Sequence, residues 1–108
     1  MALVRVCKTS EVPVGRLVLV QVGGKDLVIA NVDGKFYAMD NWCTHEEGDL
    51  SHGELRDNVV TCPEHGAQFD VASGQVLTGP DGDAPDSISP ENTYMVKVEG
   101  DDLMVELP

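Results

Sequence analysis

The sequence predicts an all-β fold on the strength of three observations. Runs of Val, Leu and Ile with the length of strands alternate with turns that contain glycine, a pattern typical of antiparallel hairpins. No stretch of ten or more residues repeats apolar side chains at the i, i+3, i+4 and i+7 positions of an amphipathic helix. The chain has 108 residues, which is the size of one domain. We therefore expect residues 1–108 to form a single all-β domain.

The N-terminal part of the chain predicts a three-stranded meander. Residues 16–22 and 26–32 are rich in Val, Leu and Ile, and Gly23-Gly24 between them tolerates the positive φ angles of a tight turn. An Asp33-Gly34 turn follows and leads into a third short strand at residues 36–39.

The C-terminal part predicts a second hairpin, in which residues 94–98 and 103–107 flank a turn at Glu99-Gly100-Asp101. Between these two parts of the chain the residue composition changes. Residues 41–53 have no strand periodicity, and residues 80–92 hold three prolines and four acids, so we expect both to be loops. Shorter strands are predicted at 59–61, at 68–71 and, after a turn at Gly74, at 76–77.

The charge of the chain excludes several classes of partner. Seven basic residues against nineteen acidic ones give a net charge of −12, so nucleic acid and anionic membrane surfaces would repel it. No apolar stretch approaches the roughly 20 residues that a membrane span requires. The first residues carry no pattern of a secretory signal. We expect a cytoplasmic protein with neither nucleic acid nor membrane as a partner.

Two short motifs carry the chemistry of the chain. Cys43-Thr44-His45 and Cys62-Pro63-Glu64-His65 each pair a thiol with an imidazole, and sixteen residues separate them. Three cysteines are an odd number, which favours metal binding over a disulfide framework. Two such loops supply four ligands, enough for one tetrahedral metal ion or for a two-metal site with bridging sulfides. Zinc takes the same ligands, so a structural zinc site is an alternative interpretation of this spacing.

The chain resembles the Rieske proteins, whose two-iron, two-sulfur cluster is held by Cys-x-His and Cys-x-x-His loops. The match continues through the run Cys62-Pro63-Glu64-His65-Gly66-Ala67-Gln68-Phe69-Asp70, followed by Gly74 and Gly79-Pro80. This resemblance implies one [2Fe-2S] cluster, with Cys43 and Cys62 on the buried iron and His45 and His65 on the outer one. It also implies a Rieske fold, in which antiparallel sheets form a sandwich-like or barrel-like base. A cluster-binding subdomain of loops and short strands, at about residues 40–77, is inserted into that base.

Within this family the chain is most similar to the ferredoxins that serve bacterial ring-hydroxylating dioxygenases. That similarity implies a one-electron carrier, a monomer and not an enzyme by itself. It would take electrons from a flavin- or ferredoxin-type reductase and pass them to a terminal oxygenase. One alternative is a small Rieske subunit of a nitrite reductase-like oxidoreductase. Another is a zinc-stabilised interaction module, which would be colourless where a Rieske protein is red-brown.

The chain departs from the respiratory Rieske proteins at four positions. Those proteins carry an extra cysteine in each loop, where this chain has Gly48 and Glu64, so their disulfide cannot form here. They also carry a Ser and a Tyr whose hydroxyls bond to the cluster and a ligand sulfur, where this chain has Ala67 and Phe69. Losing both donors disfavours the electron-rich reduced state. We expect a potential in the lower part of the range of about −150 to +300 mV.

The remaining candidate residues have plainer interpretations. We expect Cys7 to be a small packing residue in a strand, His52 to be an ordinary surface histidine and Trp42 to be a packing anchor rather than an electron relay. For Leu50 and Pro80 the sequence leaves open whether they pack generically or cover the cluster.

Acidic residues gather around the two motifs. Between Asp40 and Asp70 the chain has eight acids and one base. Solvation of loops explains such a run, but its place beside the redox centre also suits docking on the basic face of a partner. Glu46, Glu47 and Glu64 are the carboxylates nearest to the histidines in sequence.

Overall fold

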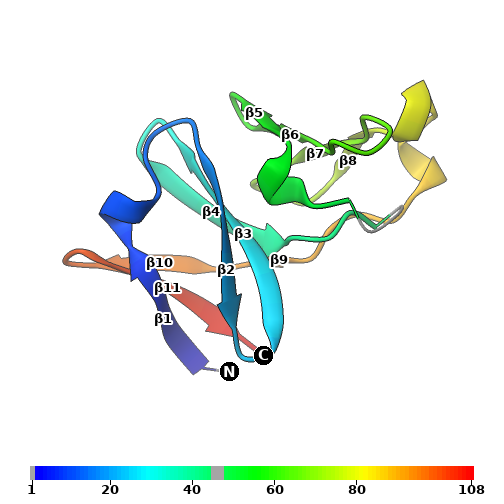
Figure 1. Ribbon diagram of the computed structural model, residues 1–108. Coiled ribbons are helices and arrows are strands. Elements are labelled where there is room, and N and C mark those ends of the chain that lie inside the picture. Colours follow the sequence, from blue (N-terminus) through cyan, green and yellow to red (C-terminus); the bar gives the residue numbers. More distant parts are fainter. Residues whose placement is uncertain (1, 45–47) are drawn as a thin grey trace.

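The computed structural model describes residues 2–44 and 48–108, and its first sheet contains the predicted meander. Strands β2 (Leu17–Val22), β3 (Lys25–Val32) and β4 (Lys35–Asp40) pair in order, with β9 (Thr93–Tyr94) beside β4 (Figure 1). Gly23-Gly24 and Asp33-Gly34 all have positive φ angles, as the two tight turns require. The turn residues thus placed three of the four strands correctly.

A second sheet joins the two ends of the chain. Its order is β1 (Ala2–Lys8), β11 (Asp102–Leu107) and β10 (Val96–Glu99), so the predicted C-terminal hairpin is confirmed. The single strand predicted at 94–98 is wrong, because the chain changes sheets at Met95. Tyr94 pairs with Ala38 of β4, whereas Val96 pairs with Val105 of β11.

The two sheets pack face to face and form the sandwich-like base. Their core contains apolar side chains from five strands, among them Cys7, Leu27, Ile29, Leu103 and Val105. Residues of β3 that alternate with Leu27 and Ile29, namely Val28 and Ala30, are buried in a different core on the opposite face. Strand β3 is therefore buried on both faces, which explains its nearly continuous apolar sequence.

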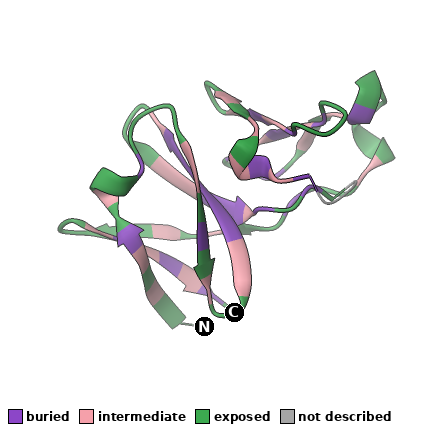
Figure 2. Cartoon of the chain, in the orientation of Figure 1, coloured by how far each residue is buried: buried purple, intermediate pink, exposed green. Residues whose placement is uncertain are grey.

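A third sheet lies beside the base and completes the second core. Its strands pair in chain order as β5 (Glu54–Arg56), β6 (Val59–Thr61), β7 (Gln68–Asp70) and β8 (Val76–Thr78). Val60 and Phe69 of this sheet are buried in the same core as Val28 and Ala30 of β3, and Figure 2 marks buried residues in purple in both sheets. Strand β5 was not predicted, because Glu54-Leu55-Arg56 has only one apolar residue. Its pairing with β6 makes it a strand.

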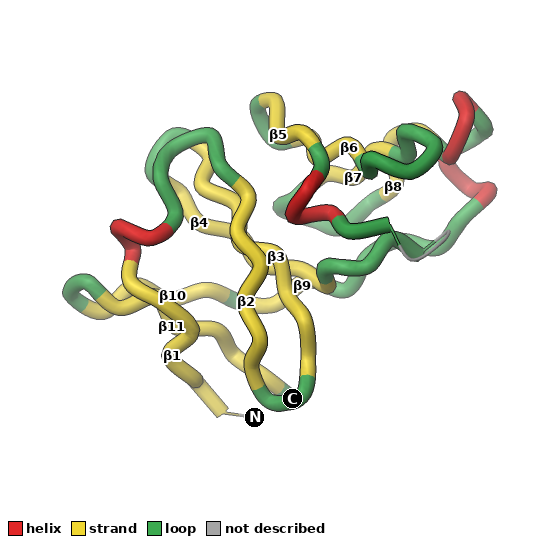
Figure 3. Tube along the Cα trace, viewed as in Figure 1, coloured by secondary structure: helices red, strands yellow, loops and turns green. Residues whose placement is uncertain are grey.

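Helical structure in residues 2–44 and 48–108 is confined to four 3-10 turns of three residues each, η1 (Thr9–Glu11), η2 (Leu50–His52), η3 (Pro80–Gly82) and η4 (Pro85–Ser87) (Figure 3). The all-β prediction is confirmed. In the same part of the chain, no helix has the length and apolar character that crossing a membrane requires. The prediction that residues 80–92 are a solvated loop is wrong for Pro80 and Glu91, which are both buried.

Candidate metal centre

The first motif lies on a loop whose base is closed by hydrogen bonds. The N–H of Cys43 donates to the carbonyl of Gly48 at 2.9 Å, and the N–H of Leu50 donates to the carbonyl of Asn41 at 2.9 Å. These bonds fix the direction of the Cys43 side chain. The other predicted ligand of this loop, His45, lies outside the described residues, as do Glu46 and Glu47.

A partly buried polar network anchors the same loop. Asp49 Oδ1 accepts hydrogen bonds from Asn41 Nδ2 at 2.9 Å and from the Ser51 N–H at 3.0 Å, and Asn41 itself is completely buried. Burial works to raise the pKa of Asp49, but the hydrogen bonds from Ser51 and Asn41 outweigh it and hold the pKa below its usual value. The carboxylate of Asp49 therefore works as a fixed hydrogen-bond acceptor at the base of the loop.

The second motif lies on the turn between β6 and β7. The N–H of Cys62 donates to the carbonyl of Ala67 at 2.8 Å, which closes the turn. His65 and Gly66 both have positive φ angles, of 59° and 72°. A left-handed conformation is unusual for a histidine and is followed here by a glycine, which adopts it without strain.

A third segment, at η3, covers the second loop. The N–H of Asp81 donates to the carbonyl of His65 at 2.7 Å, and Asp81 Oδ1 lies 3.6 Å from His65 Nδ1. The His65 side chain is 42% exposed, so it lies at the surface of the site. Asp81 was not singled out from the sequence; the Gly79-Pro80 pair directly before it was the available signal.

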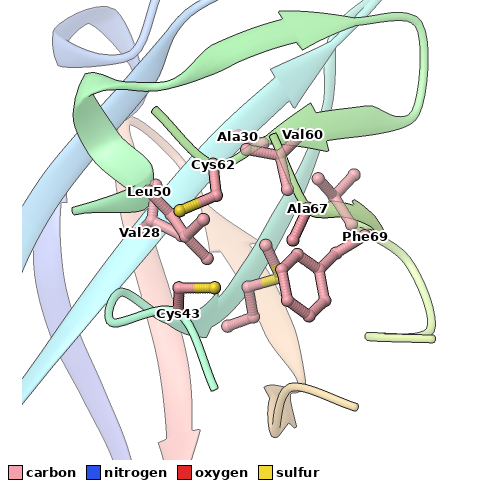
Figure 4. Close-up of a cluster of buried hydrophobic side chains, with 10 residues drawn as sticks. Val28, Ala30, Cys43, Leu50, Val60, Cys62, Ala67 and Phe69 are labelled. Atoms are coloured by element: carbon pink, nitrogen blue, oxygen red, sulfur yellow. The ribbon is translucent and has the colours of Figure 1, made fainter. Parts of the chain in front are cut away.

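The two loops bring the thiols of Cys43 and Cys62 together. Both are buried in the second core with Leu50, Ala67 and Phe69, and Figure 4 shows the two sulfur atoms in the space between the loops. Burial raises the pKa of the Cys62 thiol to about 11, and the neighbouring Cys43 thiol acts in the same direction. A bound metal reverses this preference, because a coordinating thiol is deprotonated outright.

Gly48 lies at a close approach of the two loops. A Cβ atom at this position would overlap Cys62 Sγ and would lie 3.2 Å from Glu64 Cγ and 3.4 Å from Cys43 Cβ. Positions 48 and 64 therefore face each other, although neither carries the cysteine of the respiratory proteins. Cys7, Cys43 and Cys62 are all free thiols. Two adjacent buried thiols without a disulfide are a donor set that suits a soft metal or an iron–sulfur group.

The structure brings together part of the predicted ligand set. Cys43 and Cys62 are adjacent, and His65 follows on the same turn as Cys62. Within residues 2–44 and 48–108, no three His, Cys, Asp or Glu side chains are grouped closely enough to hold one metal ion. The place of His45 is not among those described.

The other candidates have different outcomes. Cys7 is buried in β1, and the His52 side chain is 79% exposed, so both predictions are confirmed. The prediction for Trp42 is wrong, because its side chain is exposed and its Nε1 donates to Asp26 Oδ2 at 3.0 Å. Asn41 and Cys43 on either side of Trp42 face inward, so an extended chain turns Trp42 outward. Leu50 is buried in the core with both thiols.

Comparison with known proteins identifies the family. Residues 2–98 match the Rieske [2Fe-2S] domain. The chain is 35% identical over 107 residues to the biphenyl 2,3-dioxygenase ferredoxin component of Rhodococcus jostii, covering 99% of this chain and 94% of that protein. It is 39% identical over 97 residues to the naphthalene 1,2-dioxygenase system ferredoxin component of Pseudomonas aeruginosa, covering 90% of this chain and 88% of that protein.

Among solved structures, it is similar to a chain in a complex of reduced oxygenase and oxidised ferredoxin in carbazole 1,9a-dioxygenase. The TM-score is 0.83 and the identity 31%, over 95% of this chain and 91% of that chain. The predicted Rieske fold, with its sheets and inserted loops, is confirmed. The chain therefore belongs to the Rieske [2Fe-2S] family, whose cofactor is one two-iron, two-sulfide cluster.

Proposed function

We propose that this chain is a one-electron carrier between a reductase and a terminal oxygenase of the ring-hydroxylating dioxygenase type. The observation that carries the proposal is the pair of buried thiols, Cys43 and Cys62, beside the surface-exposed His65. In this proposal Cys43 and Cys62 hold one iron, and His45 and His65 hold the other. The bound cluster supplies the chemistry, which is the reversible uptake of one electron.

The chain's own residues suit that task in two ways. Hydrogen bonds at Cys43, Cys62 and Asp49 fix both loops, so little of the protein has to move when the charge of the site changes. The exposed His65 side chain gives the electron a route between the buried thiols and a partner at the surface. We infer no catalytic role, because oxidation of an organic substrate belongs to the oxygenase partner.

The names of the relatives support the proposal that the chain works with partner proteins of a dioxygenase system. Two of them are ferredoxin components of dioxygenase systems, and a solved relative is in a complex of oxygenase and ferredoxin. We infer that the tip around His65 docks on a basic face of each partner. Glu64 is exposed there, and the carboxylate of Asp81 lies beside His65. We also infer a cytoplasmic protein, since cysteines without disulfides suit a reducing compartment. We infer a monomer, since the net charge of −12 makes copies repel one another.

Metal analysis of the purified protein tests the proposed function. We expect about two irons and two acid-labile sulfides per chain, a red-brown colour and a reduced-state electron paramagnetic resonance signal of the mixed histidine-cysteine type. His65→Ala should lose the cluster, whereas the matched control His52→Ala should retain it, because His52 is an exposed histidine outside both motifs. Stoichiometric zinc in protein produced with ample iron would favour the zinc-stabilised module instead.

A further inference from the structure

Glu91 is a buried carboxyl group that the proposed function does not use. Three polar residues in the described part of the chain are buried, and the other two, Asn31 and Asn41, use their side chains in hydrogen bonds. Glu91 is only 6% exposed. Its Oε2 is the one buried side-chain nitrogen or oxygen atom in residues 2–44 and 48–108 that has no hydrogen-bond partner. Such a site favours the neutral, protonated form of the carboxyl group.

The backbone holds Glu91 against the first ligand loop. The N–H of Glu91 donates to the carbonyl of Gly74 at 2.8 Å, and a Cβ atom on Gly74 would overlap the carbonyl of Glu91. On the other side, Thr44 Oγ1 donates to the carbonyl of Ser89 at 2.6 Å, and the N–H of Thr44 donates to the Glu91 carboxylate. Thr44 follows Cys43 directly in the chain. The buried carboxyl group is therefore in contact with the loop that carries the proposed ligands.

The groups around Glu91 disfavour its negative charge. Burial, which is the main cause, and the carboxylate of Asp40 at the end of β4 together raise the pKa of Glu91 to about 8. The hydrogen bond from the N–H of Thr44 acts in the opposite direction and lowers the pKa of Glu91. From β9, Tyr94 donates its hydroxyl to Asp40 Oδ1 at 2.6 Å, and burial, Asp40 and Glu91 raise the pKa of this phenol. The Gly74 turn meets Glu91 through backbone atoms.

We propose that the carboxyl group of Glu91 is a proton-binding site linked to the redox state of the centre. The inference rests on the proposed function, which places one added electron at the end of the loop that Glu91 contacts. That electron comes from the reductase and makes the site more negative by one charge, so it strengthens proton binding at Glu91. Reduction then increases the fraction of molecules in which Glu91 carries a proton taken from water, with one O–H bond formed for each proton bound; oxidation releases the same protons.

The size of the coupling follows from electrostatics. One extra charge in a partly buried site raises a neighbouring proton affinity about tenfold. For a one-electron couple, this tenfold change corresponds to about 59 mV. Near pH 8 the potential should therefore fall by about this amount as the pH rises, and it should be level on either side of that step.

Redox-difference infrared spectroscopy at pH 8 tests the proposal. In wild-type protein labelled with 13C-glutamate, reduction should increase the carbonyl band of a protonated carboxyl group, and the label should shift that band. Glu91→Gln should abolish the band and the step in potential near pH 8. The control Glu99→Gln, at an exposed position in the distal hairpin, should preserve both.

The outcomes separate this inference from the proposed function. A wild-type protein that is reduced by one electron without any change in a glutamate carbonyl band contradicts the inference alone. A band and a step in potential that persist in Glu91→Gln contradict it as well. If Glu91→Gln does not fold, the infrared spectrum of the labelled wild-type protein still tests the inference, because a glutamate carbonyl band must increase on reduction. A protein without iron and sulfide contradicts the proposed function and this inference together.

Discussion

Replacement of Gly48 by alanine would test how closely the two ligand loops must approach. The added carbon would overlap Cys62 Sγ, well inside the normal contact distance of about 3.5–4.0 Å. Cys62 cannot easily withdraw, because its thiol is buried and its N–H is bonded to Ala67. Overpacking of a well-packed site costs about 1–3 kcal/mol. We expect about 3 kcal/mol here, since Glu64 Cγ at 3.2 Å and Cys43 Cβ at 3.4 Å are also crowded.

The respiratory proteins carry a Cβ atom at this position, but it faces a cysteine with which it forms a disulfide, whereas here it would face Glu64. Gly48→Ala should therefore push the two loops apart and lose the cluster. The assay is the iron and sulfide content per chain, together with the free energy of unfolding from urea denaturation. Gly66→Ala is the matched control: its φ is 72° but an added Cβ would meet nothing within 4 Å, so it should cost about 1–2 kcal/mol in backbone strain and keep the cluster. A Gly48→Ala protein with full iron content and less than about 1 kcal/mol of destabilisation would refute the reasoning.

Three further predictions concern the core, protons and docking. Leu50 is fully buried with both thiols, so Leu50→Ala should lower the free energy of unfolding in urea by about 3 kcal/mol. Glu91 has its pKa raised from 4.5 to about 8, so the folded state retains a proton that the unfolded state releases. Between those two pH values the stability should fall by about 4 kcal/mol. The free energy of unfolding of Glu91→Gln, measured in urea at pH 4.5 and at about pH 8, should lack this decrease. A variant whose stability falls as much as that of the wild type would contradict the assignment. In stopped-flow reduction by the reductase at low salt, Glu64→Gln with Asp81→Asn should slow electron transfer several-fold, and Asp101→Asn should not. The difference should vanish at about 1 M salt, where the Debye length is about 3 Å, and equal rates at low salt would argue against an acidic docking tip.

Local chemistry explains which parts of the fold were predictable. The Gly-Gly and Asp-Gly turns dictate tight hairpins by their backbone preferences, so the meander was visible in the sequence. The Cys-x-His and Cys-x-x-His spacings are equally local, and the structure does bring Cys43 and Cys62 together. The same kind of pattern could not show where the chain leaves one sheet for another. Tyr94, Met95 and Val96 form a continuous apolar run without a turn residue, although Tyr94 and Val96 pair with different sheets.

The features that the sequence did not reveal depend on contacts between distant segments. Glu91 lies among prolines, serines and acids, a composition typical of an exposed loop, and it is buried because Gly74 and Thr44 close over it. Strand β5 exists because β6 pairs with it. Trp42 was expected to be a packing anchor rather than an electron relay, but its two inward-facing neighbours turn it toward solvent.

The three open sheets have a consequence for how copies of the chain meet one another. Among residues 2–44 and 48–108, each sheet ends in two strands that pair on one side only, and such edges invite a strand from another molecule. Exposed charged side chains lie on several of them, including Arg5 on β1, Glu54 and Arg56 on β5, and Lys97 and Glu99 on β10. A second copy that approached an edge would bring these charges and a further net charge of −12 with it. For the electron carrier that we propose, this repulsion would keep copies from pairing with one another and would leave the surface around His65 accessible to the proposed partners.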